Sequence, residues 1–464
     1  MNTRTTPPIL SINPATGETL AEFSSDSASV IEAKLAATAA AQSDWARLTI
    51  EERCGLLDRM AKALRSGAAD YACLITLEMG KPIAEAEAEI EKCAWCCEHY
   101  RDQAAAYLKG EVIASGASHS EVVFDPLGSV LAVMPWNYPF WQFFRFAAPA
   151  LAAGNATLLK HASNVPQCAL AIADVMAAAG APEGLTATLM IGSGAVRGVL
   201  ADPRVAAVTL TGSTEVGAQV AAQAGGLLKK QVLELGGSDP FIVLEDADID
   251  AAVAVAVKSR FQNTGQSCIA AKRFIVVDAI ADRFADAFTA GAAALKVGDP
   301  FDRSNTQGSM ARANLRDELH DQVTRALTDG ATLRTGGAPL DGPGAFYQPT
   351  VLDHVTPDNP VFREETFGPV AAIVRVPDAD TAVAQANATE FGLGAGLWTA
   401  DLDRARTLAR RIEAGAVFVN GLVASDPRLP FGGIKQSGYG RELGAWGIRE
   451  FTNTKTLWVG PASS

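Results

Sequence analysis

The chain has 464 residues and a formal net charge of −13, with 48% hydrophobic and 20% charged residues, so it can bury a large core and is not a disordered chain. At about 150 residues per domain, the length allows roughly three domains or two large ones, and the acidic balance argues against a nucleic acid or an anionic membrane as partner. No apolar stretch approaches the ~20 residues of a membrane span and no signal-peptide pattern opens the chain, which predicts a cytoplasmic protein.

The first part of the chain is predicted to be helical. Between residues 26 and 107, a pattern rich in Ala, Glu and Leu has a helical period and is broken at three places. Cys93, Cys96 and Cys97 share one face of the last helix, and the second ligand pair that a zinc site needs is missing. These cysteines are therefore expected in the core, without a metal. The five histidines form no tight cluster, which argues against a histidine-centred catalytic triad.

Strands and helices alternate over the rest of the chain, in one series up to residue 235 and another from 240 to about 420. Such alternation is typical of parallel, doubly wound sheets, and two α/β domains usually place the active site in the cleft between them. The pattern predicts strands at 121–124, 128–134, 157–160, 186–191, 206–210, 231–235, 241–244, 274–277, 370–376 and 416–420, and helices that include 166–179, 214–223, 249–261 and 311–327.

Two further segments lie outside this alternation. The Gly- and Pro-rich stretch 336–349 is predicted to be a surface loop, since patterned structure continues on both sides. The tail 451–459 alternates as a strand does and has no obvious partner among the last elements of the chain. We expect it to pair with the sheet edge of another subunit.

Two glycine-containing segments could bind phosphate. The stretch 192–198 follows a strand, but its glycine spacing is one residue too long for a dinucleotide fingerprint. The stretch 210–217 is better, because Gly212 ends a strand and the hydroxyl of Ser213 can cap a helix whose N-terminus would face a pyrophosphate. An ordinary helix cap explains this segment equally well.

Two residues could carry chemistry. Cys268 lies in a polar loop, where neighbouring amides would lower the pKa of an exposed thiol and bind an oxyanion; a buried, inert cysteine is the alternative. Glu234 ends a strand between leucines, and an apolar environment would raise its pKa into the range of a general base. A solvated glutamate at a strand end is the alternative there.

Together the motifs resemble the NAD(P)-dependent aldehyde dehydrogenase superfamily, and most closely the shorter bacterial succinate-semialdehyde dehydrogenases. They occur in family order over nearly the whole chain, with Glu234 placed 34 residues before Cys268. The resemblance is carried by Pro135-Trp136-Asn137-Tyr138-Pro139, Lys160, residues 211–217, Glu234-Leu235-Gly236-Gly237, Gly265-Gln266-Ser267-Cys268, Glu364-Glu365-Thr366-Phe367-Gly368-Pro369 and Pro430-Phe431-Gly432-Gly433.

The resemblance implies an aldehyde dehydrogenase-like α/β fold with two doubly wound domains. The Rossmann-type cofactor domain would comprise residues 1–110 and 129–236, and the catalytic domain residues 237–435. A small β oligomerisation element would comprise residues 111–128 and 436–464. Family members assemble through such an element, so a homodimer or a homotetramer is expected.

The resemblance also implies the roles of the site residues. The Cys268 thiolate would attack the aldehyde carbon, while the Asn137 side-chain amide and the Cys268 backbone N–H hold the oxyanion. Hydride transfer to NAD or NADP would leave a thioester, and Glu234 would activate the water that hydrolyses it. The cofactor would contact Trp136, Lys160, Ser163, Gly212, Ser213, Glu365 and Phe367, although Phe367 could also be a plain core residue.

Cofactor preference depends on Ser163. Members of the family devoted to NAD often carry a glutamate three residues after the lysine, and this chain has Ser163 in that place after Lys160. Without the repulsive carboxylate, NADP is permitted, and use of NAD is not excluded. His161 need not be charged to contribute to binding of NADP.

The substrate end is expected along the helix that follows Asn137. A guanidinium fits a carboxylate, and Arg145 and Ser425 occupy the carboxylate-binding positions of succinate-semialdehyde dehydrogenases. Some members have a second arginine six residues before the nucleophile, where this chain has Gln262. An ion pair with an acidic neighbour is the alternative for Arg145, and a tunnel or core role is the alternative for Phe431. The expected substrate residues are Arg145, Trp141, Gln142, Ser425 and Phe431.

The predicted function is oxidation of succinate semialdehyde, or of a similar short carboxylated aldehyde, to the acid. A broad aldehyde dehydrogenase is the alternative, because Tyr138, Trp141 and Phe144 would give the tunnel an aromatic lining. Glu234 argues against release of the thioester to coenzyme A. A non-catalytic binding protein is disfavoured because the catalytic side chains are intact.

Overall fold

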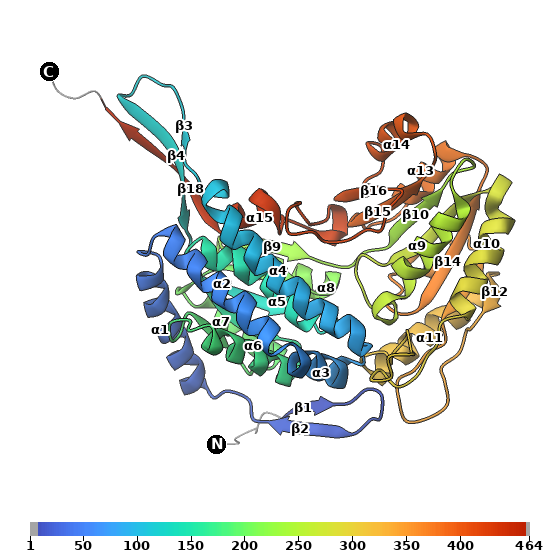
Figure 1. Cartoon of the computed structure of the whole chain (residues 1–464), viewed down its shortest axis with the longest axis horizontal. Coiled ribbons are helices and arrows are strands. Elements are labelled where there is room, and N and C mark those ends of the chain that lie inside the picture. Colours follow the sequence, from blue (N-terminus) through green and yellow to red (C-terminus); the bar gives the residue numbers. More distant parts are fainter. Residues whose placement is uncertain (1–7, 461–464) are drawn as a thin grey trace.

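The computed structural model describes residues 8–460, which form two lobes, each built on a mostly parallel sheet (Figure 1). The blue to green lobe holds a six-stranded sheet, and the yellow to orange lobe holds a seven-stranded sheet. Helices cover both sheets, as the alternating hydrophobic pattern predicts for parallel strands connected by helical crossovers. The α/β fold class is therefore confirmed.

The six-stranded sheet of the first lobe has the order β17-β9-β8-β5-β6-β7, and only the pair of β17 with β9 is antiparallel. The chain proceeds outward from β5 through β6 and β7 and then returns to β8 on the other side. This reversal creates a crevice at the carboxyl ends of β5 and β8, where doubly wound sheets bind their ligands. The strands are β5 (Ser129–Met134), β6 (Ala156–His161), β7 (Thr186–Thr188), β8 (Val205–Thr211), β9 (Lys230–Glu234) and β17 (Gly438–Tyr439).

The helices of the first lobe begin and end where local signals require. Thr49 and Glu52 form a capping box at the start of α2, and Gly80 ends α3 in a left-handed conformation with φ 77°. The predicted helical region and its three breaks are thereby confirmed. The helices are α1 (Ala28–Trp45), α2 (Ile50–Ser66), α3 (Ala68–Met79), α4 (Ile83–Tyr107), α5 (Pro139–Ala152), α6 (Pro166–Ala178), α7 (Ser193–Ala201) and α8 (Thr214–Gly226).

The core of the first lobe includes the cysteine cluster of α4. Cys93, Cys96 and Cys97 are fully buried, and burial raises the pKa of each thiol. The prediction that they pack as small apolar residues is confirmed. Among residues 8–460, no group of three or more His, Cys, Asp or Glu side chains is arranged to hold a metal ion.

The seven-stranded sheet of the second lobe has the order β12-β13-β14-β11-β10-β15-β16, with only β12 antiparallel to its neighbour. Its strands are β10 (Asp239–Val243), β11 (Ala271–Val277), β12 (Thr332–Thr335), β13 (Thr350–Asp353), β14 (Val370–Val376), β15 (Gly394–Trp398) and β16 (Ala416–Val419). Its helices are α9 (Ile249–Phe261), α10 (Asp278–Ala293), α11 (Ala313–Thr328), α12 (Pro360–Arg363), α13 (Ala379–Asn387) and α14 (Leu402–Ala409).

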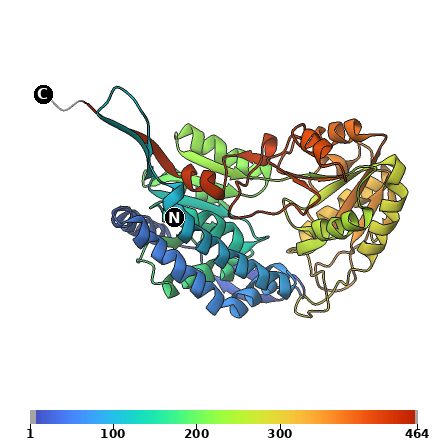
Figure 2. The ribbon, with the colours of Figure 1, turned by 45° about the horizontal axis from the view of Figure 1, so that its top comes forward.

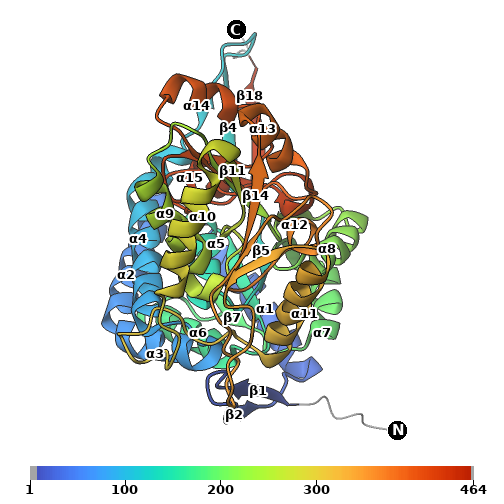
Figure 3. The same cartoon turned by 90° about the vertical axis from the view of Figure 1, so that its right-hand side faces the viewer.

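The C-terminal strand β18 (Thr452–Val459) pairs antiparallel with β4 (His119–Pro126), which also pairs with β3 (Glu111–Val112). The tail therefore forms the expected strand, and its partner in this chain is not among the last elements but lies more than 300 residues earlier. This three-stranded sheet extends away from both lobes (Figures 1 and 3). Val112, Trp458 and Val459 on it are exposed.

The chain returns from the second lobe to the first before it reaches β18 (Figure 2). On the way, β17 joins the first sheet and α15 (Gly444–Glu450) packs against α4 and α5. The segment 436–451 therefore packs with the first lobe. The physical reason is that β9 offers an open edge to β17.

The N-terminal hairpin of β1 (Ile9–Ile12) and β2 (Thr19–Phe23) lies near the loop 336–349. The backbone N–H of Ala345 donates to Pro14 O, and Tyr347 is fully buried. The predicted loop is thus present, but part of it is anchored in the core. None of the helices formed by residues 8–460 combines the length and the apolar character that a bilayer crossing requires.

Candidate active site

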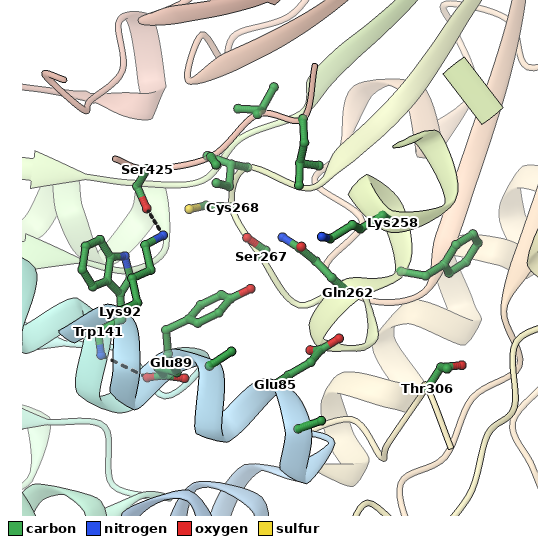
Figure 4. A pocket seen from close by; sticks show the side chains of 18 of the residues that line it. Glu85, Glu89, Lys92, Trp141, Lys258, Gln262, Ser267, Cys268, Thr306 and Ser425 are labelled. Atoms are coloured by element: carbon green, nitrogen blue, oxygen red, sulfur yellow. Dashed lines mark hydrogen bonds between the residues drawn. The ribbon is translucent and has the colours of Figure 1, made fainter. Parts of the chain in front are cut away.

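A cavity of about 600 Å³ lies between the two lobes (Figure 4). Its walls come from α4 and α5 of the first lobe, from α9 and the loop 262–269 of the second lobe, and from the segment 422–431. Cys268, Arg145, Trp141, Gln142, Ser425 and Phe431 all line it. The predicted cleft between two α/β units therefore brings the expected nucleophile and the expected substrate residues together.

The loop that carries Cys268 is rigidly held. Asn263 and Thr264 have φ 55° and 53°, and a Cβ on Gly265 would lie 2.3 Å from Gly368 O, so glycine is required there. The ammonium of buried Lys272 donates to the carbonyls of Ser267, Cys268 and Ala270 at 3.1, 2.8 and 3.2 Å. These bonds fix the backbone from which the thiol projects into the cavity.

The Cys268 thiol is largely enclosed. Burial raises its pKa to about 12, although the positive charges of Arg145 and Lys272 act in the opposite direction. The expectation of a lowered thiol pKa is therefore wrong, because removal of the thiolate from water outweighs the neighbouring charges. A nearby base must accept the proton if the thiol is to react at neutral pH.

Asn137 lies at the turn between β5 and α5 and is buried. Its Nδ2 donates to the carbonyl of Gln266 at 3.1 Å, and Asn263 Nδ2 donates to the Asn137 carbonyl at 2.9 Å. The Asn137 amide is thereby fixed against the loop that carries the nucleophile. A side-chain N–H so fixed can donate to an oxygen that gains charge beside the thiol.

Glu234 ends β9 and is buried, and neither of its carboxylate oxygens has a hydrogen-bond partner in residues 8–460. Burial, and then the neighbouring Glu442 carboxylate, raise the pKa of Glu234 to about 8. The predicted rise is confirmed. A carboxylate with this pKa and no fixed partner is suited to accept a proton near neutral pH.

Arg145 is a fully buried side chain of α5 whose charge is already balanced. Its Nε forms an ion pair with the Glu442 carboxylate, its Nη2 donates to Thr211 Oγ1 at 3.4 Å, and its guanidinium lies 4.8 Å from the centre of the Phe431 ring. The ion pair that the sequence left open as an alternative is therefore present. Sequence reasoning missed Glu442, because it lies nearly 300 residues away and carries no local signal.

Lys92 is a second basic residue of the cavity, and the sequence did not point to it. It extends from α4, where its Nζ donates to Ser425 Oγ at 2.8 Å and lies 4.3 Å from the centre of the Trp141 ring (Figure 4). Glu85, Glu89 and Lys92 form a charged stripe with helical spacing, which usually indicates a solvated helix face. Packing of α4 against α5 turns that stripe into a cavity wall.

The crevice at the carboxyl ends of β5, β6 and β8 holds several of the residues expected to bind the cofactor. Ser213 caps α8 by accepting from Val216 N at 3.4 Å, and Gly212 N donates to Glu234 O at 3.1 Å. Lys160 lies one residue before the end of β6 and is buried, which lowers its pKa. The predicted helix cap is thus present. The backbone N–H groups of the first turn of α8, which have no partner within the helix, lie at the crevice.

Two further residues come from the second lobe. Glu365 accepts from the backbone N–H of Gly237 at 3.0 Å and lies 3.5 Å from Lys272 Nζ. Phe367 meets Trp136 of the first lobe edge to face, with ring centres 5.6 Å apart. The predicted residues of the two lobes are therefore brought together only in the tertiary structure.

His161 is neutral in this environment. Burial lowers its pKa to about 4, its Nδ1 accepts from Ala162 N, and its Nε2 bonds to the Pro139 carbonyl at 2.9 Å. Ser163 beside it is exposed. No carboxylate stands at the third position after Lys160, where this chain has Ser163.

Comparison with known proteins places these residues in context. The sequence profile of the family described as "Aldehyde dehydrogenase family" matches residues 2–457. A protein named as a probable succinate-semialdehyde dehydrogenase, NADP(+), of Synechocystis sp. is 51% identical over 97% of this chain and 99% of its own length. A succinate semialdehyde dehydrogenase, NAD(P)+, of Escherichia coli is 51% identical over 97% of both chains. The crystal structure of succinic semialdehyde dehydrogenase from Streptococcus pyogenes with NADP+ superposes with a TM-score of 0.95 at 38% identity, covering 98% of this chain and 100% of that one.

Proposed function

The chain belongs to the aldehyde dehydrogenase family, and from this membership we propose that it oxidises succinate semialdehyde, or a similar short carboxylated aldehyde, to the carboxylic acid with NAD or NADP. The observation that carries the proposal is the shared cavity between the lobes, which is lined by both Cys268 and basic side chains. The names of relatives about half identical over the full length support the same substrate.

In this mechanism Cys268 attacks the aldehyde carbon and forms a C–S bond. Because burial raises the pKa of the thiol, its proton must pass to a base, and Glu234 has a raised pKa and no competing hydrogen bond. The Asn137 amide and the Cys268 backbone N–H stabilise the oxyanion. After oxidation, Glu234 takes a proton from the water that attacks the thioester, and the acid leaves as the thiol reforms.

A nicotinamide cofactor, when bound, supplies the acceptor for the hydride. The residues of the crevice fit such a group, because α8 directs free N–H groups to it and a Cβ on Gly236 would lie 2.4 Å from Glu365 Oε2. We propose that Trp136, Lys160, Ser163, Gly212 and Ser213 bind the adenosine and pyrophosphate side. Glu365 would bind the nicotinamide ribose, and Phe367 would pack by the ring.

For the substrate we propose contacts from the far wall of the cavity. Trp141 and Phe431 would flank the carbon chain, and Gln142 has a buried carbonyl oxygen without a partner in residues 8–460. Arg145 and Ser425 would lie at the carboxylate end. A broad aldehyde dehydrogenase remains the second candidate, favoured by the aromatic side chains of this wall.

Kinetics on two matched aldehydes test the substrate. Butanal has the four-carbon chain of succinate semialdehyde with a methyl group in place of the carboxylate. Butanal cannot make the charged contact of the carboxylate, which contributes about 1–3 kcal/mol. The value of kcat/KM should therefore be roughly 10- to 100-fold higher for succinate semialdehyde than for butanal. Equal kcat/KM on both aldehydes would contradict the carboxylate proposal and support broad specificity.

Oxidation of the nucleophile gives a second expected result. Cys268 is the one cysteine that lines the cavity within residues 8–460, and Cys93 and Cys168 are fully buried. Hydrogen peroxide should therefore inactivate the enzyme by stepwise oxidation of Cys268, without an intramolecular disulfide. Two measurements check this: peptide mapping after mild peroxide treatment, and an assay of how much activity dithiothreitol restores. A disulfide that includes Cys268 would refute it.

We further propose that the lobes divide as the family implies, with the cofactor domain in residues 1–110 and 129–236 and the catalytic domain in 237–435. A homodimer or homotetramer is proposed as the assembly. The exposed apolar side chains on β3 and β18 support it, because patches of this kind are usually covered by a partner.

A further inference from the structure

We propose that Lys92 is a substrate-binding residue whose ammonium group, beside the Ser425 hydroxyl, supplies the positive charge that binds the distal carboxylate of the aldehyde. This inference rests on the proposed oxidation of a carboxylated aldehyde and names the charge that selects it. Arg145 alone does not provide that charge, because Glu442 already balances it.

The geometry places Lys92 in the cavity with the nucleophile. Its Nζ is held at two points, by the Ser425 hydroxyl at 2.8 Å and by the face of Trp141 at 4.3 Å. The Cys268 thiol points toward the part of the cavity where Lys92 and Ser425 lie (Figure 4). A short aldehyde with its carbonyl at the thiol can therefore direct its other end toward the ammonium group.

The charges around the cavity leave Lys92 uncompensated. Glu89 is paired with Lys81 and also accepts from Phe140 N and Trp141 N at the start of α5. Within residues 8–460, no carboxylate oxygen forms an ion pair with Lys92 Nζ, whose only polar partner is Ser425. A largely enclosed ammonium without an anion is unfavourable, and a bound carboxylate would supply the missing charge.

The hydrogen-bonding capacity of the pair also suits a carboxylate. An ammonium has three donors, of which Lys92 uses one toward Ser425 Oγ. The Ser425 hydroxyl accepts that bond, so its own proton is free to be donated. Lys92 and Ser425 together can thus donate to both oxygens of a carboxylate, while Gln262 on the opposite wall is neutral.

Substitution of Lys92 tests the proposal more cleanly than substitution of Arg145, whose loss would leave Glu442 buried and unpaired. Lys92→Met should lower kcat/KM for succinate semialdehyde by about 10- to 100-fold, mainly through KM, and weaken binding of succinate as a competitive inhibitor to a similar extent. Its kcat/KM on butanal should stay within about twofold. Lys92→Arg should restore most of the loss, because it keeps the charge.

The pH dependence gives an independent measurement. Burial, and then the charge of Arg145, lower the pKa of Lys92 to about 8; Glu89, Cys93 and Cys96 of α4 are the other titratable groups that act on it. The ammonium is charged below that pKa and loses its charge above it. The inhibition constant for succinate should therefore rise above about pH 8 in the wild type and stay flat in Lys92→Arg.

Lys62→Met is the matched control, since Lys62 is an exposed lysine of α2 that pairs with Asp58. It should leave all constants unchanged. If the wild type prefers succinate semialdehyde but Lys92→Met keeps its KM and its affinity for succinate, the inference is wrong and the proposed function stands. If Lys92→Met lowers kcat/KM equally for both aldehydes, Lys92 is structural. The same conclusion follows if Lys92→Met has a much lower melting temperature and Lys92→Arg does not restore activity. A wild type that does not discriminate the two aldehydes overturns both proposals.

Discussion

Replacement of Cys268 with alanine should reduce aldehyde oxidation by at least roughly 10⁴-fold, on the scale seen when other covalent enzymes lose their nucleophile. The C–S bond cannot form without the thiol, and neither Asn137 nor Glu234 can replace it. The side chain only lines the cavity, while the loop is held through backbone carbonyls by Lys272. The variant should therefore fold and still bind the cofactor.

The measurement is steady-state formation of reduced cofactor, alongside thermal melting and cofactor binding by fluorescence. Cys73→Ser is the matched control, because Cys73 is a half-buried thiol of α3 that does not line the cavity. Its turnover should equal that of the wild type. Retention of turnover in Cys268→Ala, or an equal loss in Cys73→Ser, would overturn the assignment of the nucleophile.

Replacement of Glu234 with glutamine should lower turnover by about 10²- to 10⁴-fold, because the amide cannot accept a proton from water. In this variant the thioester on Cys268 should form more slowly, because Glu234 also takes the proton of the thiol, and once formed it should persist because its hydrolysis lacks a base. Intact-mass spectrometry of the acid-quenched enzyme should detect it as an added acyl group. Glu413→Gln is the control, since Glu413 pairs with Lys435 away from the cavity.

The pH dependence of hydrolysis should change in the same variant. Since the pKa of Glu234 is raised to about 8, its carboxylate form increases as the pH rises through that value. Thioester hydrolysis in the wild type should rise with pH and level off above about pH 8, and Glu234→Gln should lose this dependence. If Glu234→Gln turned over at the wild-type rate and no acyl group accumulated on it, another residue would be the base.

Much of the fold follows from local sequence patterns. The predicted helix 249–261 and the predicted strand 370–376 have the bounds that the structure gives for α9 and β14. Such boundaries depend on caps and on hydrophobic periodicity over a few residues, which the sequence contains. The tail differs: its alternation predicts a strand, but its partner β4 is distant along the chain, and only the folded lobes bring the two edges together.

The sequence alone also pointed to the residues proposed as catalytic, because Asn137, Glu234 and Cys268 each lie in a short, recognisable motif. Their electrostatics were decided by the tertiary structure. The pKa of Cys268 is raised rather than lowered, and Arg145 meets Glu442, while Lys92 is left without a carboxylate partner. Desolvation and ion pairing depend on which distant segments pack together, and no local pattern records that choice.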